Sequence, residues 1–315
     1  MKEKLTRIVV ILGPTGVGKT AISLSLAERL HAEIVSADSM QIYRGMNIGT
    51  AKATAADRAR IPHHCIDLLE VTERYSAAQY QRDARSAIAQ IQQKEKLPIL
   101  VGGTGLYLRA ALEAYDFSDA KVDLSLRSSL QERAAQEGNL SLLNELESVD
   151  AKTAAKLHVN DAKRIIRALE VYYSTGKPIS LAEQVTEQAE PLYQVIYFGL
   201  TRPREQLYAR IEQRVDQMFE SGLTEEVRQL MQQGLTERVP AGQALGYKEF
   251  FPYFQGTVSL DSVTALLKQN TRRYAKRQMT WFRANQQIHW FDLSRFASEE
   301  MLLEELETLV KHTLF

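Results

Sequence analysis

The 315-residue sequence predicts an α/β protein, in which a parallel sheet is flanked by helices and interrupted once by an all-helical segment. Short apolar runs alternate with longer helical patterns over residues 1–115 and again over 191–315, as expected for βαβ units. Between them, residues 116–190 lack strand-like runs and are dominated by Leu, Ala, Glu and Gln. We therefore expect a core of residues 1–115 and 191–315 and a helical insertion domain of residues 116–190.

The elements follow from apolar periodicity and from the residues that start and stop helices. Runs rich in Val, Ile and Leu predict strands, whereas the helices show apolar residues every three or four positions. The expected strands are residues 8–12, 32–37, about 64–69, 97–101, 194–200 and 288–292. The expected helices are residues 21–30, 77–94, 124–136, 140–147, 151–157, 161–174, a long one starting at 201–203, 260–284 and 299–312.

Composition excludes several classes of protein. Hydrophobic residues make up 44% and charged residues 25% of the chain, which is ordinary for a globular protein. No apolar run approaches the roughly 18 residues that a membrane-spanning helix needs, so we expect a cytoplasmic protein without membrane contact. The single cysteine, Cys65, excludes an internal disulfide. Formal net charge is zero, so a nucleic-acid partner would need a local basic patch.

The most specific motif is G-x-x-x-x-G-K-T at residues 13–20, placed between a predicted strand and a predicted helix. Its glycines let backbone N–H groups converge on a phosphate, and the helix start adds a positive dipole end. Lys19 is expected to reach the outer phosphate oxygens, and the Thr20 hydroxyl to bind Mg²⁺. The motif predicts a P-loop NTPase-like core that binds a di- or triphosphate. The expected phosphate-binding residues are Gly13, Pro14, Thr15, Gly16, Val17, Gly18, Lys19 and Thr20.

Two other predicted strands end in polar or small residues at the edge where such sheets bind ligands. Asp38 follows the strand 32–37, where it is placed for chemistry or simply caps a turn. The strand 97–101 ends in G-G-T-G-L-Y, where a P-loop hydrolase would carry an aspartate for its Mg²⁺. These glycines and Thr104 leave room for a flat base to approach, or form a plain turn into a helix.

Basic residues gather on three predicted helices. Arg210 and Arg214 share one helix face, from which one of them can reach the phosphates. In the insertion, Lys163, Arg164 and Arg167 form a basic face. Such a face is equally typical of an ordinary solvent-exposed helix. The helix 260–284 has no acid between residues 268 and 283 and carries interleaved aromatics, which favours RNA contact over a solvated face. Its cations are Lys268, Arg272, Arg273, Lys276, Arg277 and Arg283.

Taken together, these motifs resemble the bacterial tRNA dimethylallyltransferases. The resemblance extends in order over nearly the whole chain, and no block is decisive alone. Unlike eukaryotic relatives, the chain has no Cys/His finger after the core. Besides the phosphate motif, the matching blocks are S-A-D-S at 36–39, Q-I-Y at 41–43, N-I-G-T-A-K at 47–52, P-H-H at 62–64, G-G-T-G-L-Y at 102–107, R-A-L-E-V at 167–171, G-Y at 246–247 and K-R-Q-M-T-W-F-R at 276–283.

The resemblance implies transfer of a dimethylallyl group from dimethylallyl diphosphate to N6 of the adenine 3′ of the anticodon, position 37 of tRNA, with release of pyrophosphate. It implies Asp38 as general base, Thr104 beside the adenine, and Arg214 rather than Arg210 on the pyrophosphate. Mg²⁺ is the expected cofactor and a monomer the expected state, with tRNA-binding helices at the carboxyl end. The residues expected to contact the anticodon stem-loop are Asp38, Ser39, Met40, Gln41, Thr104, Arg127, Lys163, Arg164, Arg167, Gly246, Tyr247, Lys276, Arg277 and Arg283.

Three other functions would use some of these features. A small-molecule kinase would share the phosphate loop and the Mg²⁺ site but would bind ATP and would not need the cation-rich helix. A noncatalytic RNA-binding module would explain that helix but not the loop with Asp38 nearby. Prenylation of free adenine nucleotides would need neither the insertion nor the carboxyl-terminal basic helix.

Overall fold

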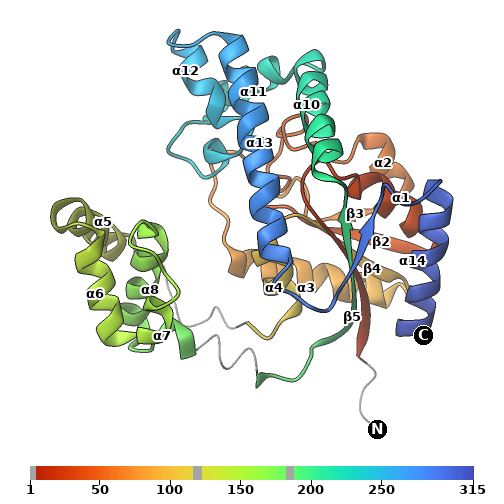
Figure 1. Cartoon of the computed structure of the whole chain (residues 1–315), viewed down its shortest axis with the longest axis horizontal. Helices are drawn as coiled ribbons and strands as arrows, with labels where there is room; N and C mark the ends of the chain where they lie inside the picture. The colour runs from red at the N-terminus through yellow and green to blue at the C-terminus, as the bar shows by residue number, and fades with distance from the viewer. Residues whose placement is uncertain (1–4, 116–122, 182–187) are drawn as a thin grey trace. The chain divides into compact units, whose positions relative to one another are not determined.

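A computed structural model describes residues 5–115, 123–181 and 188–315 (Figure 1). Its contacts divide the chain into two compact units, one of Met1–Leu112 with Tyr193–Phe315 and one of Glu113–Leu192. The first unit holds the sheet, and the second contains the segment assigned above to a helical insertion.

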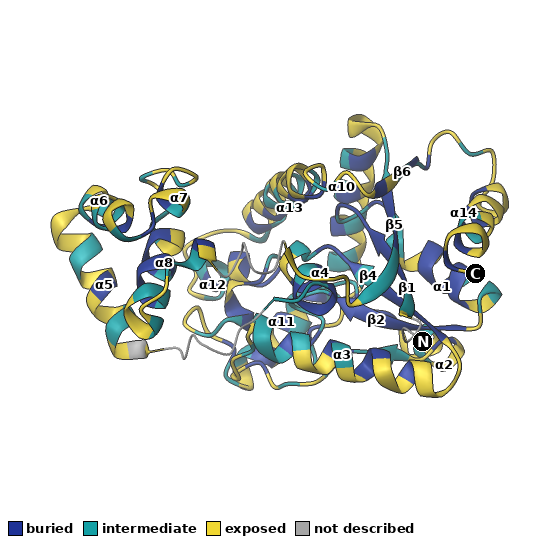
Figure 2. Ribbon diagram, turned by 90° about the horizontal axis from the view of Figure 1, so that it is seen from below, coloured by how far each residue is buried: buried dark blue, intermediate teal, exposed yellow. Residues whose placement is uncertain are grey.

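The sheet has six strands in the order β3-β2-β4-β1-β5-β6, and every pairing is parallel. This confirms the predicted α/β fold. The strands β1, β2 and β4 are almost entirely buried, as their apolar runs indicated, whereas β3, β5 and β6 are only partly buried (Figure 2). Their bounds are β1 Thr6–Leu12, β2 Ala32–Ala37, β3 His63–His64, β4 Leu97–Gly102, β5 Tyr193–Thr201 and β6 Ile288–Asp292.

Helices cover the sheet because parallel strands are apolar on both faces. Helices α1 (Lys19–Arg29) and α14 (Glu299–Leu314) pack together, and Leu26 and Leu303 share a core with Val9 of the sheet. Helices α3 (Ala77–Gln93) and α4 (Gly105–Leu112) form a second pair. Because β1 and β2 both pair with β4, the loops that follow these three strands meet at one edge of the sheet.

The third strand is shorter than predicted. Only His63 and His64 pair with β2, and Leu69 makes a single bridge to Tyr43. Cys65 and Asp67 lie between them with φ values of 58° and 53°, in the left-handed region that interrupts a strand. A short helix, α2 (Ala55–Arg60), precedes β3.

The first unit has a further core beside the sheet, built by the remaining helices. Leu223, Tyr247, Phe250 and Leu267 are buried together there. Along the described parts of the chain, every helix is too short or too polar to span a bilayer. The helices around this core are α10 (Arg204–Glu220), α11 (Leu223–Gln232), η1 (Ala241–Gln243), η2 (Lys248–Phe250), α12 (Phe251–Phe254) and α13 (Leu260–Phe282).

The second unit is helical where it is described, as predicted, and its expected start at residue 116 lies outside the described residues. Leu130, Leu146, Ile165 and Leu169 form its core. The helices whose bounds are described there are α5 (Leu124–Glu137), α6 (Asn139–Val149), α7 (Ala151–Ala154) and α8 (Ala162–Thr175).

Candidate active site

The loop of residues 13–20 joins β1 to α1 in a conformation that requires glycine. Gly13, Gly16 and Gly18 have φ values of 147°, 82° and 116°, which other residues rarely adopt. A Cβ at Gly13 would also lie 2.5 Å from the Leu200 carbonyl oxygen. Helix α1 begins at Lys19, so its first N–H groups point into the loop.

A cavity of about 380 Å³ lies against this loop; we call it the phosphate-loop cavity. Residues of the segment after β2, together with α10 and α13, form the rest of its wall. Asp38 therefore faces the same space as the phosphate loop. The lining residues are Thr15, Gly16, Gly18, Lys19, Thr20, Asp38, Gln41, Thr50, Ala51, Gly103, Arg210, Gln213, Arg214, Gln217, Tyr274 and Gln278.

The cavity is built to receive an anion. Burial lowers the pKa of Lys19 to about 7, helped by repulsion from Arg214 and opposed by Asp38. Burial also lowers the pKa of Arg214, against the attraction of Asp38. The Lys19 ammonium is held by the carbonyl oxygens of Gly13 and Pro14, each at 2.9 Å. A bound diphosphate would supply the negative charge that these cations lack.

Both arginines that the sequence left as alternatives line the phosphate-loop cavity. Arg210 Nε donates to the Gly16 carbonyl at 3.2 Å, so this guanidinium also braces the loop backbone. Arg214 lines a second cavity as well and interacts with Lys19 and Asp38. Arg214 therefore lines both cavities, whereas Arg210 lines only the first of these two.

Asp38 both caps a turn and faces the cavity, which are the two possibilities that its sequence context left open. One carboxylate oxygen accepts hydrogen bonds from the N–H groups of Met40 at 2.9 Å and Gln41 at 3.4 Å, which closes a turn. The carboxylate nevertheless lines the cavity. Gln41 is fixed in turn by Ser36, whose hydroxyl donates to its Oε1 at 2.9 Å. The turn therefore orients Asp38 toward the phosphate loop.

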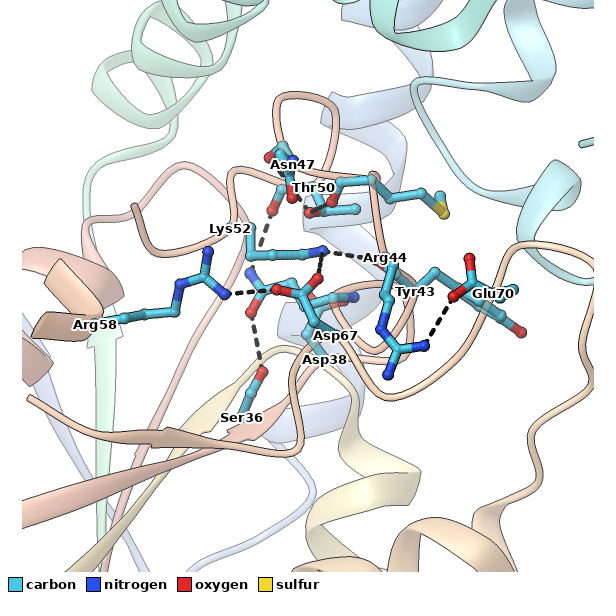
Figure 3. Close-up of polar contacts among 12 residues, drawn as sticks. Ser36, Asp38, Tyr43, Arg44, Asn47, Thr50, Lys52, Arg58, Asp67 and Glu70 are labelled. Atoms are coloured by element: carbon cyan, nitrogen blue, oxygen red, sulfur yellow. Dashed lines mark hydrogen bonds and ion pairs between the residues drawn. The ribbon is translucent and has the colours of Figure 1, made fainter. Parts of the chain in front are cut away.

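Ion pairs around the buried Lys52 support the segment that follows (Figure 3). Lys52 Nζ donates to the Tyr43 carbonyl at 2.7 Å and to Asp67 at 2.6 Å, and Arg58 binds the other Asp67 oxygen at 2.5 Å. Burial lowers the pKa of Lys52, while Asp67 opposes that shift. Sequence reasoning placed Lys52 in a matching block and gave it no role.

Glu226 of α11 holds the same segment from another side, which no feature of the sequence indicated. Its carboxylate accepts the N–H groups of Asn47, Ile48 and Gly49 at 2.8 to 3.1 Å, and the Tyr247 hydroxyl at 2.7 Å. Tyr247 is completely buried. The structure thus offers no exposed surface of Tyr247 for the tRNA contact expected from sequence.

A second cavity, of about 420 Å³, adjoins the first and shares Thr15, Asp38, Thr50, Arg214 and Tyr274 with it. We call it the basic-helix cavity because α13 forms much of its wall. Asp38 therefore borders both spaces. Other lining residues include Ser39, Met40, Val215, Met218, Leu245, Lys248, Leu267, Arg273 and Arg277.

The basic character of α13 is less uniform than its sequence indicated. Lys268 pairs with Asp216, and Arg272 pairs with Glu212, so acids from α10 neutralise two of the six cations. The other four are at least partly exposed: Arg273, Lys276, Arg277 and Arg283.

The glycine turn after β4 is filled by side chains of this chain. A Cβ at Gly103 would lie 2.1 Å from Gln278 Nε2, and one at Gly105 would lie 2.2 Å from Trp281. Both side chains come from α13, and their position favours the plain turn over space for a base, although Gly103 also lines the phosphate-loop cavity. Thr104 accepts a hydrogen bond from the Ser39 N–H at 3.2 Å and so lies directly behind the Asp38 turn.

In the second unit, the predicted basic face is partly paired. Glu170 is fully buried, and its carboxylate binds Arg127 at 2.7 Å and Arg167 at 3.0 Å. Lys163 and Arg164 are exposed on α8.

Gly246, another residue expected to contact tRNA, lies in the first unit in a turn with a φ value of 92°.

Oxygen atoms at the phosphate-loop cavity are of the kind that binds Mg²⁺ rather than a transition metal. Thr20 and Asp38 line the same cavity, and Mg²⁺ typically binds one or two protein oxygens together with water and phosphate. In the described residues, no three His, Cys, Asp or Glu side chains form a metal-binding group.

The geometry defines an α/β protein of the P-loop class, with a carboxylate between an anion-binding cavity and one bordered by a basic helix. The chain belongs to the IPP transferase family, whose model matches residues 41–285.

Known proteins of similar sequence and structure agree with the resemblance described above. A tRNA dimethylallyltransferase of Carboxydothermus hydrogenoformans is 47% identical over 301 residues, which cover 96% of each chain. The crystal structure of a tRNA isopentenylpyrophosphate transferase from Bacillus halodurans superposes with a TM-score of 0.73 at 40% identity, covering 98% of this chain and 96% of that one. A eukaryotic dimethylallyltransferase, captured acting on tRNA, gives a TM-score of 0.78 at 29% identity, covering 98% of this chain and 80% of that one.

Proposed function

We infer that this chain transfers a dimethylallyl group from dimethylallyl diphosphate to N6 of adenine 37 of tRNA. The single observation that best supports this reaction is the position of Asp38, which borders both the phosphate-loop cavity and the basic-helix cavity. In the reaction, the bond between the first carbon of the donor and its diphosphate oxygen breaks. A bond from N6 to that carbon forms, the N6 proton passes to a base, and pyrophosphate leaves.

The donor diphosphate binds at the loop of residues 13–20. Lys19 and Arg214 neutralise the charge that grows on the leaving group as the carbon–oxygen bond breaks. The N–H groups of α1 add to this field. Of the loop amides, Thr15 N–H is already bound to Gln278 and Val17 N–H to the Pro14 carbonyl, so the others serve the diphosphate.

The Thr20 hydroxyl, with water and diphosphate oxygens, would hold Mg²⁺ near the start of α1. The ion supplies positive charge to the diphosphate when it is bound. Every other contact with the donor comes from residues of the chain itself.

The acceptor adenine enters through the basic-helix cavity. It must leave its stack in the anticodon loop to reach Asp38, at a cost of a few kcal/mol that contacts in the cavity offset. Asp38 accepts the N6 proton. Ser39, Met40 and Gln41 lie beside it, and Thr104 supports the turn from behind.

The exposed cations of α13 bind the RNA backbone. Replacing both Lys276 and Arg277 with alanine should weaken tRNA binding and lower the slope of log K against log salt by about one for each phosphate that is no longer neutralised. The affinity for pyrophosphate should stay within about twofold of the wild-type value, because neither side chain lines the phosphate-loop cavity. Filter binding over a range of salt concentrations measures the tRNA affinity, and calorimetry measures that for pyrophosphate.

A matched control is Lys311→Ala, which removes an exposed cation from α14. It should leave the affinity for tRNA and its salt slope unchanged. An unchanged slope in the double variant would show that Lys276 and Arg277 face only solvent and do not bind RNA.

Labelled dimethylallyl diphosphate and unmodified tRNA test the function directly. Incubation with the protein and Mg²⁺ should place the label on N6 of adenine 37. Thermal stabilisation by ATP but not by dimethylallyl diphosphate would favour a small-molecule kinase. Label on free adenine nucleotides instead of tRNA would favour an enzyme that prenylates free nucleotides. The expected monomer and cytoplasmic location stay predictions, which sedimentation and cell fractionation can test.

A further inference from the structure

Gln278 joins two loops of the site through one buried side chain. Its Oε1 accepts the N–H of Thr15 in the phosphate loop at 2.9 Å. Its Nε2 donates to the carbonyl of Gly103 at 2.9 Å. The residue is only 6% exposed, so both atoms of the amide are satisfied within the protein.

The space for this amide exists because residue 103 has no side chain. A Cβ there would lie 2.1 Å from Gln278 Nε2, whereas the Gly13 carbonyl oxygen would be 3.7 Å away. Gly103 does not have a positive φ, so its backbone does not require glycine. The close approach of the Gln278 amide is therefore what favours glycine at residue 103.

The turn that receives Gln278 also supports the general base. Thr104 N–H donates to the Ala37 carbonyl at 3.2 Å, and its hydroxyl accepts the Ser39 N–H at 3.2 Å. These bonds flank Asp38 on both sides. Gln278 thus connects the loop that would hold the donor to the segment that orients Asp38.

The same residue stands on the helix that presents exposed cations. Arg277 and Lys276 immediately precede it, and Arg277 lines the basic-helix cavity. We propose that Gln278 is a positioning residue that couples docking of tRNA on α13 to the alignment of the phosphate loop with Asp38. The proposal rests on the proposed function, because it assigns α13 to RNA.

Coupling is measured as a change in one affinity caused by the other ligand. Pyrophosphate binding to the full chain is titrated alone and with a saturating unmodified anticodon stem-loop RNA. In the wild type, the RNA should change the pyrophosphate affinity by about fivefold or more. In Gln278→Met this factor should fall below about twofold, and the single-turnover rate by about tenfold, because a buried amide that holds two loops is removed.

Two further variants separate coupling from loss of structure. Gln269→Met changes a glutamine of the same helix that is not buried, and it should keep the wild-type factor. Gly103→Ala displaces the end of the Gln278 side chain without straining the backbone, so it should reproduce the Gln278→Met defect. The double variant should be no worse than either single one, since residues in contact are not additive.

The outcomes are distinct. Equal coupling in Gln278→Met and wild type, or no coupling in wild type, would overturn the proposal even if the wild type modifies tRNA. A wild type that fails to modify tRNA would instead overturn the proposed function. If thermal unfolding shows that Gln278→Met is not folded, Gly103→Ala decides.

Discussion

Replacing Asp38 with asparagine should lower the single-turnover rate of dimethylallyl transfer by about 10² to 10⁴-fold, the usual contribution of a general base. Asparagine keeps the oxygen that accepts the Met40 and Gln41 N–H groups, so the turn should persist. It cannot take the N6 proton. Pyrophosphate should bind as tightly or more tightly, because a negative charge near Lys19 and Arg214 is removed.

Rapid-quench kinetics with labelled donor measure the rate, and calorimetry measures the affinities. Asp123→Asn is a suitable control, since Asp123 caps α5 by accepting the N–H groups of Ser125 and Leu126 in the same manner. That variant should keep the wild-type rate. Near-normal turnover in Asp38→Asn would remove Asp38 as the base.

Replacing Lys19 with methionine should lower the rate by about 10² to 10³-fold, as for loss of a group that stabilises charge in the transition state.

The affinity of the wild type for pyrophosphate should also depend on pH. Its Lys19 has a pKa of about 7, lowered chiefly by burial. A bound diphosphate favours the ammonium and raises this pKa, so binding takes up a proton above about pH 7. The affinity for pyrophosphate should therefore fall as pH rises from about 7 toward about 9.

Pyrophosphate itself titrates in this range, and Lys19→Arg corrects for that. Arginine stays charged throughout, so its pH profile contains only the titration of the ligand and of other groups. The wild type should lose more affinity than this variant between about pH 7 and about pH 9, and calorimetry in two buffers should show greater proton uptake. Identical profiles would contradict a lowered pKa for Lys19.

Much of the fold could be predicted because it depends on local patterns. The apolar runs at 8–12 and 97–101 match β1 and β4 within two residues, and the glycines of residues 13–18 have the positive φ values that the phosphate motif requires. The third strand is shorter than the sequence predicts because two non-glycine residues adopt left-handed conformations. No local sequence pattern indicates such conformations.

The supports of the candidate site could not be predicted in this way. Gln278 binds Thr15 from 263 residues away, and Glu226 binds Asn47 from 179 residues away. Neither residue type signals such a role, because glutamine and glutamate are common on solvated helices. Only the packing of α11 and α13 brings these side chains to the loops.

The charge of α13 could not be predicted from its own sequence for the same reason. The absence of acids from residues 268–283 indicated a uniform basic helix, but Asp216 and Glu212 on α10 pair with two of its cations. The glycines at 103 and 105 were as typical of space for a base as of a plain turn, and side chains of α13 lie beside both. Neither feature could be predicted, because contacts with other helices do not appear in a local sequence pattern.

A crystal structure with an unreactive thio analogue of the donor and an unmodified anticodon stem-loop tests the central claim most directly. The diphosphate should lie in the loop of residues 13–20. Adenine N6 should lie about 3 to 3.5 Å from the first carbon of the donor and within hydrogen-bond distance of the Asp38 carboxylate. A diphosphate outside this loop, or an adenine whose N6 is separated from Asp38, would contradict it.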